Sequence, residues 1–308
     1  MDFIYPNYYE DFACIKGACR HSCCIGWEID IDEDTLAYYD TLEGAIGERV
    51  RGAIDRDVPC FRLGADERCP FLNGDGLCDL ILALGENGLC EICEEHPRFY
   101  NAFRDRTECG LGLACEAAAR RILLSEAPFV LRTAEGNYPT PTDEILLLRD
   151  EVIRVLQNRN LPLDERIEAA RVLCKTPTPD VSAAEWAKRF LLLERLDDAW
   201  TEHLLRLSER EVHTPDEEFL AWERQSPVCT QFLVYLVYRH LSQAEDEADA
   251  AETFGFIEAS FRLFRALLMT HPCGTSDREY ATEIARLFSS EIEYSDENVD
   301  AIKAYFRA

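Results

Sequence analysis

Cysteines are concentrated at one end of this chain. Eleven of its 14 cysteines lie within the first 115 of 308 residues, and four of them form the run C-x4-C-x3-C-C-x-G-W, which contains Cys14, Cys19, Cys23 and Cys24. Thiolates are soft ligands that bind zinc ions and iron–sulfur clusters. A chain of this length buries a sizeable core without help from a metal, so folding alone does not explain so many cysteines. The N-terminal third is therefore predicted to be a metal-binding domain.

Seven more cysteines follow in the same region: Cys60, Cys69, Cys78, Cys90, Cys93, Cys109 and Cys115. Cys90 and Cys93 form a C-x2-C pair, a spacing that lets two sulfurs converge on one ion. Side chains of adjacent residues diverge, so Cys23 and Cys24 are expected to serve either a cluster of several metal atoms or two separate sites. Three isolated cysteines are interpreted as small buried hydrophobic residues: Cys174, Cys229 and Cys273.

The chain carries a formal net charge of −27. Such a charge repels phosphate backbones and anionic lipids, which argues against binding to nucleic acid or to a membrane surface. No apolar run approaches the roughly 18 residues that span a bilayer, and segment 1–6 lacks the basic and apolar regions of a secretory signal. We therefore expect a cytoplasmic protein with reduced cysteines rather than a disulfide framework.

The composition of the chain changes near residue 125. Residues 1–125 are predicted to form an irregular, Cys-rich metal-cluster domain, and residues 126–308 a helical domain, so the fold class is mainly α. Apolar residues at i, i+3 and i+4 spacing predict about seven helices in the second domain. The predicted ranges are 143–158 with Thr142 as N-cap, 182–207 with a capping box of Ser182 and Glu185, 216–224, 228–243, 251–270, 280–289 and 298–306. Residues 128–132 are predicted to form a short strand.

Several segments resemble a known family. They are Phe12-x-Cys14, Cys19-x3-Cys23-Cys24-x-Gly26-Trp27, Cys69-Pro70-Phe71-Leu72, Gly76-x-Cys78 and Cys93-x2-His96-Pro97-Arg98. This set is similar to a zinc- or iron-chelating cysteine domain with a C-x-x-C-x-x-C-C type of signature. Two features resemble more narrowly the flagellin lysine-N-methylase family. They are Gly26-Trp27, which follows the adjacent cysteines, and Cys109-x5-Cys115, which precedes a helix. The resemblance covers residues 1–125 and continues weakly at Tyr235-x2-Tyr238-Arg239-His240 and at 297–302.

The resemblance implies a protein-lysine N-methyltransferase that carries methyl groups from S-adenosylmethionine to lysine side chains of flagellin. It also implies a cysteine-ligated iron–sulfur cluster of the 4Fe–4S type, with zinc as the alternative metal. The metal ligands that it implies are Cys14, Cys19, Cys23, Cys24, Cys69, Cys78, Cys93, Cys109 and Cys115. This set exceeds the ligands of one four-cysteine cluster, so some members are expected to be structural, to support the ligands or to bind a second metal.

Two further residues are expected to contribute to cofactor binding. The guanidinium of Arg98 could contact a cluster sulfide or the carboxylate of the donor, with a structural salt bridge as the alternative. Trp27 could hold a cationic group by cation–π contact, with a place in the core as the alternative. The sequence identifies no catalytic residue. A free lysine has a pKa of about 10.4, so the site must remove a proton that a buried carboxylate or a tyrosine could take.

Two features of common enzymes that use S-adenosylmethionine are missing from the sequence. No strand followed by a glycine-rich turn, with an acidic residue about 20 positions further on, indicates a Rossmann-type site. The C-x3-C-x2-C spacing of familiar radical enzymes would require a cysteine where Gly26 stands. The donor is therefore expected to bind in another way, for which an open iron of the cluster is one candidate.

Two other classes of function remain open. The chain could be a metal-binding or metal-delivery module without catalysis, which predicts a removable metal. It could instead be a structural zinc protein whose helical domain binds a partner, which predicts colourless protein with tightly held zinc. The sequence indicates no oligomeric state.

Overall fold

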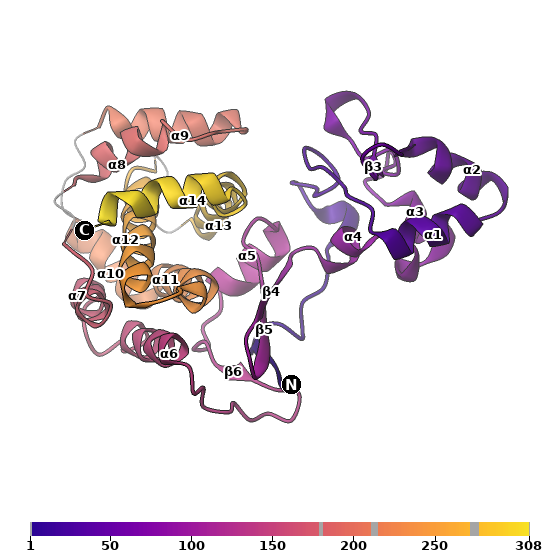
Figure 1. The fold of residues 1–308 in the computed structure, drawn as a ribbon. Helices are drawn as coiled ribbons and strands as arrows, with labels where there is room; N and C mark the ends of the chain where they lie inside the picture. Colours follow the sequence, from indigo (N-terminus) through magenta and orange to yellow (C-terminus); the bar gives the residue numbers. More distant parts are fainter. Residues whose placement is uncertain (1, 179–180, 211–214, 272–276, 308) are drawn as a thin grey trace. The chain divides into compact units, whose positions relative to one another are not determined.

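The fold is described from a computed structural model, which covers residues 2–178, 181–210, 215–271 and 277–307. The chain divides into two compact units, which we call the helical unit and the cysteine unit (Figure 1). The helical unit comprises Met1–Phe12, Tyr100–Ala114 and Ala118–Ala308, and the cysteine unit comprises Ala13–Phe99 and Cys115–Ala117.

The division differs from a single boundary near residue 125, because the first strand of the chain pairs with a strand that follows the cysteine unit. Strand β1 (Asp2–Pro6) runs parallel to β5 (Arg106–Leu111), with Ile4 opposite Glu108. On its other edge β1 pairs antiparallel with β6 (Leu131–Arg132). With β4 (Arg98–Ala102) these strands form a sheet in the order β4-β5-β1-β6. The predicted strand at 128–132 is present only at its last two residues.

The helical unit confirms the prediction of a mainly α fold. Its helices in the described residues are α5 (Glu116–Leu123), α6 (Glu144–Leu156), α7 (Leu163–Leu173), α8 (Ala183–Phe190), α9 (Asp198–Ser208), α10 (Glu217–Gln225), α11 (Val228–His240), α12 (Glu247–Met269), α13 (Arg278–Phe288) and α14 (Asp296–Lys303). The first two residues of α5 belong to the cysteine unit. A π-helical turn at Ser289–Glu293 joins α13 to α14.

Two helices form the centre of the helical unit. Every residue of α11 from Val228 to Tyr238 is buried, so this largely apolar helix is enclosed on all sides. The 23-residue helix α12 packs against it, and the rings of Phe232 and Phe264 stack with centroids 4.1 Å apart. Gly255 lets α12 approach the end of the chain, since a Cβ there would lie 2.2 Å from the ring of Phe306.

Three details of the helical unit differ from the sequence-based prediction. The helix predicted at 182–207 is two helices, α8 and α9, and the carboxylate of Glu291 accepts hydrogen bonds from the backbone N–H groups of Leu196 and Asp197 in the segment between them. Helix α7 was not predicted. The N-cap of α6 is Asp143 and not Thr142, since the Asp143 carboxylate accepts from two N–H groups of the first turn.

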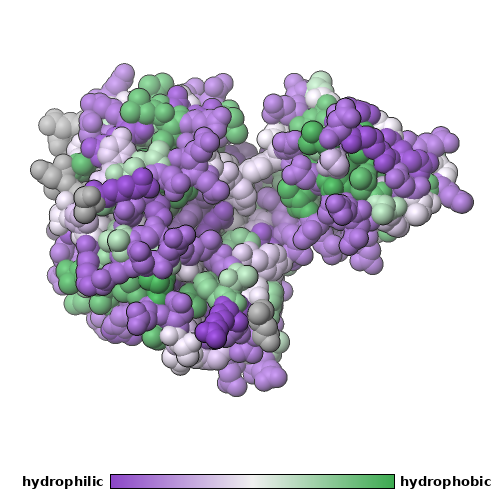
Figure 2. Space-filling view, viewed as in Figure 1, coloured by the Kyte–Doolittle hydropathy of each residue, from purple (hydrophilic) through white to green (hydrophobic). Residues whose placement is uncertain are grey.

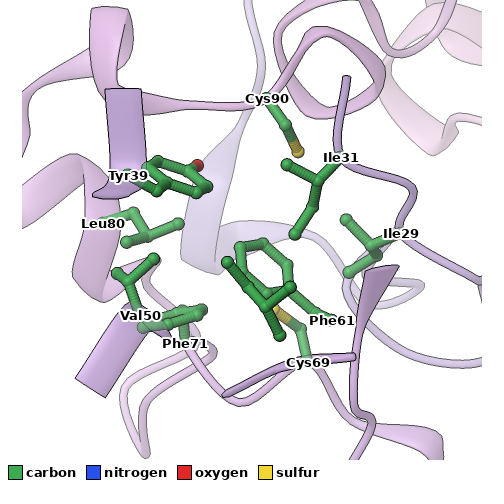
Figure 3. Close-up of a cluster of buried hydrophobic side chains, with 10 residues drawn as sticks. Ile29, Ile31, Tyr39, Val50, Phe61, Cys69, Phe71, Leu80 and Cys90 are labelled. Carbon is green, nitrogen blue, oxygen red and sulfur yellow. The ribbon is translucent and has the colours of Figure 1, made fainter. Parts of the chain in front are cut away.

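The cysteine unit has short elements around a small core. They are α1 (Glu33–Thr41), α2 (Gly44–Ala53), α3 (Asp79–Leu84), α4 (Glu91–Glu95) and an antiparallel pair of β2 (Ile54–Asp55) and β3 (Cys60–Phe61). Figure 3 shows the core side chains, among which the rings of Phe61 and Phe71 meet edge to face at 4.9 Å. The hydroxyl of Tyr39 donates to the carbonyl of Gly88 at 2.9 Å. Each large side chain enclosed here stabilises the fold by about 1.5–3 kcal/mol.

The surface agrees with the acidic composition. Hydrophilic residues cover most of the visible face of each unit, and hydrophobic residues appear there in separate patches (Figure 2). In the described part of the chain, no helix combines the length and the apolar character that crossing a bilayer requires.

Candidate cysteine centre

Five cysteines of the cysteine unit gather around its hydrophobic core, and we call them the inner cysteine group. Its members are Cys24, Cys69, Cys78, Cys90 and Cys93. Cys69 and Cys90 belong to the core itself (Figure 3). The other three pack against it. Segments from 24 to 93 are thus brought to one place by the fold of this unit.

Local hydrogen bonds explain how these cysteines meet. The backbone N–H of Cys69 donates to the carbonyl of Cys24 at 2.8 Å, which holds two distant segments together. Cys78 and Cys90 are the N-caps of the short helices α3 and α4. The N–H of Cys93 donates to the carbonyl of Cys90 at 3.0 Å, so one helical turn carries both sulfurs of the C-x2-C pair.

Gly26 fixes the turn that follows the adjacent cysteines. Its φ is +76°, in the left-handed region that favours glycine, and its N–H donates to the carbonyl of Glu67 at 3.1 Å. A cysteine at this position would be strained. The backbone therefore accounts for the glycine that interrupts the spacing of a radical-enzyme signature.

The inner thiols interact electrostatically. Burial raises the pKa of Cys69 to about 12 and also raises that of Cys78. The pKa of Cys24 is lowered to about 6, chiefly by a hydrogen bond from the Cys23 thiol. In the C-x2-C pair the Cys93 thiol lowers the pKa of Cys90, and Cys93 itself has a raised pKa. The other thiols of the inner cysteine group lose their protons only beside a positive charge, which a metal cation would supply.

A second set of four cysteines, the outer cysteine group, includes the other member of the adjacent pair. Its members are Cys14, Cys19, Cys23 and Cys115. Burial raises the pKa of Cys19 and a hydrogen bond with Cys24 raises that of Cys23, and Cys14 and Cys115 raise both pKa values further. Cys23 and Cys24 were predicted to point apart, but their thiols share a hydrogen bond. Each of the two nevertheless has different cysteines as its other neighbours. The nine cysteines of these two groups therefore suit two sites better than one.

A buried carboxylate adjoins the outer group. Glu116 is 3% exposed and follows Cys115 directly. It accepts from the backbone N–H of Arg20 at 3.0 Å and from its Nε at 3.1 Å. The thiol of Cys19 lies 3.8 Å from the same carboxylate and donates to the carbonyl of His21 at 3.2 Å. The sequence did not identify Glu116 as a site residue, because a single acidic residue after a cysteine forms no recognisable motif.

The two cysteine groups offer donors for a metal. The donors are soft thiols, which suits zinc or an iron–sulfur cluster. Within the ranges that the structure describes, however, no three His, Cys, Asp or Glu side chains already have the positions of ligands to one metal ion. Cys273 lies outside those ranges. The donor chemistry therefore fits, and coordination requires the thiols to close on the metal.

The remaining predicted site residues are not in the two groups. Cys109 is fully buried on β5 in the helical unit, where its carbonyl accepts from the hydroxyl of Tyr238 at 2.8 Å. Arg98 is half-buried and donates to the carbonyl of Glu94 at 3.1 Å, and Trp27 is half-buried in the cysteine unit. Conversely, Cys90 was absent from the predicted ligands, although its C-x2-C spacing was a usable signal.

Known proteins similar to this chain include two lysine-N-methylases. The one from Salmonella choleraesuis (strain SC-B67) is 29% identical over 157 residues, which cover 46% of this chain and 39% of that protein. The one from Salmonella typhimurium (strain LT2) matches with the same identity and the same shares. The flagellar biosynthetic protein FliU of Salmonella muenchen is 26% identical over 129 residues, which cover 38% of this chain and 75% of that protein.

These similarities make the chain a distant relative of those proteins. The match spans about two fifths of the length of the two lysine-N-methylases. No family model matches the chain, so the resemblance of residues 1–125 to a cysteine domain stays a prediction. No solved structure matches it either.

Proposed function

We propose that this chain is a protein-lysine N-methyltransferase that acts on flagellin, with S-adenosylmethionine as the methyl donor and a cysteine-ligated iron–sulfur cluster. The observation that supports the reaction is the similarity to lysine-N-methylases over 46% of the chain. The FliU protein, which is named as a flagellar biosynthetic protein, supports flagellin as the substrate.

The inner cysteine group supports the cofactor part of the proposal. It offers more than the four thiolates that a 4Fe–4S cluster takes, and Cys24, Cys69, Cys78 and Cys93 are the members that the family resemblance also implies. When bound, such a cluster supplies a positively charged iron that can attract the carboxylate and amino groups of a donor. The half-buried Cys24, whose pKa of about 6 makes it the most readily ionised of the four, would engage the metal first.

The outer group would then serve in another way. Its buried Glu116 binds the backbone and side chain of Arg20 and so fixes the loop between Cys19 and Cys23. A loop fixed in this manner positions Cys23, and through it the hydrogen bond that favours the thiolate of Cys24. Glu116 is thus assigned a positioning role.

A methylation assay tests this function. Protein purified without oxygen and loaded with iron and sulfide is incubated with flagellin and S-adenosylmethionine, and methyl-lysine is counted by mass spectrometry. We expect methyl transfer by the wild type, loss of transfer in Cys93→Ser, and retained transfer in Cys174→Ser, which changes a buried cysteine of the helical unit. Absence of methyl-lysine with the loaded wild type, or full transfer by Cys93→Ser, would contradict the proposal.

A non-catalytic metal-binding module is the alternative. The enclosure of Cys69 and Cys90 in the hydrophobic core favours it, because structural metal sites are closed to solvent. Zinc held by the wild type together with no binding of S-adenosylmethionine would favour this alternative over the methylase.

A further inference from the structure

The helical unit contains a polar cavity of about 310 Å³ that none of the functions above uses. It lies between the end of α11, the start of α12, the π-helical turn and α14. We call it the Glu293 cavity, and its lining includes Arg239, His240, Asp249, Glu293, Asp300 and Lys303. Two segments noted in the sequence, 235–240 and 297–302, border this cavity although they are far apart in the chain.

The floor of the Glu293 cavity is a carboxylate–imidazole pair. Glu293 is fully enclosed, and its Oε1 lies 2.7 Å from Nε2 of His240, whose side chain is 14% exposed. The hydroxyl of Tyr235 donates to Oε2 of Glu293 at 3.0 Å. This carboxylate sits on a π-helical turn, a rare form that occurs frequently at functional sites.

The protonation states of the pair follow from its surroundings. Burial opposes the charge of Glu293, but Arg239 and His240 outweigh it and lower the pKa of Glu293 to about 2. Burial lowers the pKa of His240, with Glu293 acting in the opposite direction and Arg239 and Lys303 adding to the lowering. Near pH 7 the imidazole is therefore neutral. Its Nε2–H donates to Glu293, which leaves Nδ1 with a lone pair that accepts no hydrogen bond from any residue in the described ranges.

The charges around the Glu293 cavity are not balanced. Arg239 lies 3.4 Å from Glu293, and Lys303 lies 2.5 Å from Asp249, so both permanent cations have an acidic partner. Asp296 and Asp300 also line the cavity, and neither has a salt bridge within the described part of the chain. Two unmatched carboxylates and a neutral imidazole favour a ligand with positive charge.

Two observations distinguish an organic cation from a metal ion. The volume of about 310 Å³ exceeds that of a bare ion and is at the lower end of small-molecule pockets. Val299 and Ala244 provide apolar wall, which suits an alkyl chain behind a charged head.

We propose that the Glu293 cavity binds an alkylammonium group, and specifically the side chain of a lysine in a substrate protein, with His240 accepting one of its N–H groups. The choice of a protein lysine over a free diamine rests on the proposed function. The inference that the ligand is an ammonium group rests on the cavity alone. Asp296 and Asp300 are exposed and attract the cation at the mouth. Deeper in the cavity, the neutral imidazole backed by Glu293 receives it.

A titration without donor tests the site on the full chain. The probes are Nα-acetyl-L-lysine methylamide, its neutral norleucine counterpart and the free diamine cadaverine, with the dissociation constant measured by calorimetry at low salt. We compare the wild type with Asp296→Asn/Asp300→Asn, in which two exposed carboxylates are removed. The matched control is Asp198→Asn/Glu202→Gln, because these exposed acids have the same i, i+4 spacing at the start of α9 and do not line the cavity.

We expect the lysine probe to bind the wild type and the control alike, and to bind the cavity variant about fivefold to tenfold more weakly. The norleucine probe should not bind, and cadaverine should bind no more tightly than the lysine probe. The inference is overturned if the lysine and norleucine probes bind equally, or if the control variant loses as much affinity for the lysine probe as the cavity variant does. If cadaverine binds more tightly than the lysine probe, the ligand is not the lysine of a protein. Because the titration needs neither metal nor donor, a failed methylation assay with intact lysine binding would reject the proposed function alone.

Discussion

The imidazole of His240 and the carboxylate of Glu293 are joined at 2.7 Å, although they are 53 residues apart in the sequence. The pair links the end of α11 to the π-helical turn before α14. Tyr235, more than one turn earlier in α11, and Arg239, the residue before His240, approach the same carboxylate. A charge enclosed to this degree is stable only while its partners remain, so the helical unit should respond to acid through this site.

The stability of the helical unit is predicted to fall in acid because of Glu293. Its folded pKa of about 2 is below the ordinary value of 4.5, so its contribution is present above pH 4.5 and is lost as the pH falls toward 2. The shift corresponds to about 3 kcal/mol of unfolding free energy. Urea unfolding followed by tryptophan fluorescence at several pH values measures this, since Trp186, Trp200 and Trp222 all lie in this unit.

Glu291→Gln is the control for that prediction. Glu291 is buried on the same turn, but burial raises its pKa, so its removal should leave the loss of stability below pH 4.5 in place. Glu293→Gln should be less stable near pH 7 and should flatten the acid dependence. An unchanged acid dependence in Glu293→Gln would show that the described pair is not responsible.

Gly255→Ala is predicted to destabilise the helical unit by about 1–3 kcal/mol, because the core has no room for a methyl group there. The added Cβ would lie 2.2 Å from the ring of Phe306, which stacks on Trp186 with centroids 5.7 Å apart. Thermal unfolding measures the change. Gly52→Ala is the matched control, since Gly52 lies in α2 with nothing within 4 Å, and it should be neutral or stabilising by up to about 1 kcal/mol. Equal effects of the two changes would contradict the close packing of α12.

The buried ion pair of Glu108 and Arg149 should show strong coupling. Both side chains are fully enclosed, with Nη1 of Arg149 2.6 Å from Oε2 of Glu108, and the pair ties β5 to α6. Arg149→Met removes the guanidinium that binds both oxygens of Glu108 and leaves this buried carboxylate with Arg106, 3.9 Å away, so it should cost about 3–5 kcal/mol of unfolding free energy. Glu108→Leu/Arg149→Met should be more stable than Arg149→Met alone. Additive effects in this double-mutant cycle would mean that the pair does not interact.

Cys24 is predicted to be the most reactive cysteine of the metal-free, reduced protein. Its pKa of about 6 gives mostly thiolate at pH 7, whereas burial raises the pKa of Cys69 to about 12. Brief treatment with iodoacetamide, followed by peptide mass spectrometry, should find label at Cys24 well before Cys69. Loading with metal should protect Cys24. Faster labelling of Cys69 than of Cys24 would contradict the described hydrogen bond with Cys23.

Local patterns predicted the helices well where the controlling residue is near in sequence. Ser182 caps α8 by accepting from the N–H of Glu185, as its spacing predicted. The break between α8 and α9 was not predictable, because Glu291, which binds the intervening segment at Leu196, is 95 residues away in the sequence. The sheet was missed for the same reason, since β1 finds its partner only after the whole cysteine unit.

The candidate sites show the same limit. The family resemblance selected most of the cysteines, but only the fold separates Cys23 from the inner group that contains Cys24. Cys109 was among the predicted ligands because Cys109-x5-Cys115 resembles the family, yet its strand β5 belongs to the helical unit. The segment 235–240 was noted in the sequence, whereas its partner Glu293 had no signal because an isolated acid in an acidic chain is unremarkable.

The metal and acid-labile sulfide of protein purified without oxygen, measured together with its absorption spectrum, test the cysteine centre most directly. Cys93→Ser changes the inner group, and Cys174→Ser is the buried cysteine control. We predict iron with a matching amount of sulfide and absorbance near roughly 400 nm in the wild type and in Cys174→Ser, and loss of both in Cys93→Ser. Zinc alone in colourless wild-type protein, or iron and sulfide unchanged in Cys93→Ser, would contradict a cluster held by the inner cysteine group.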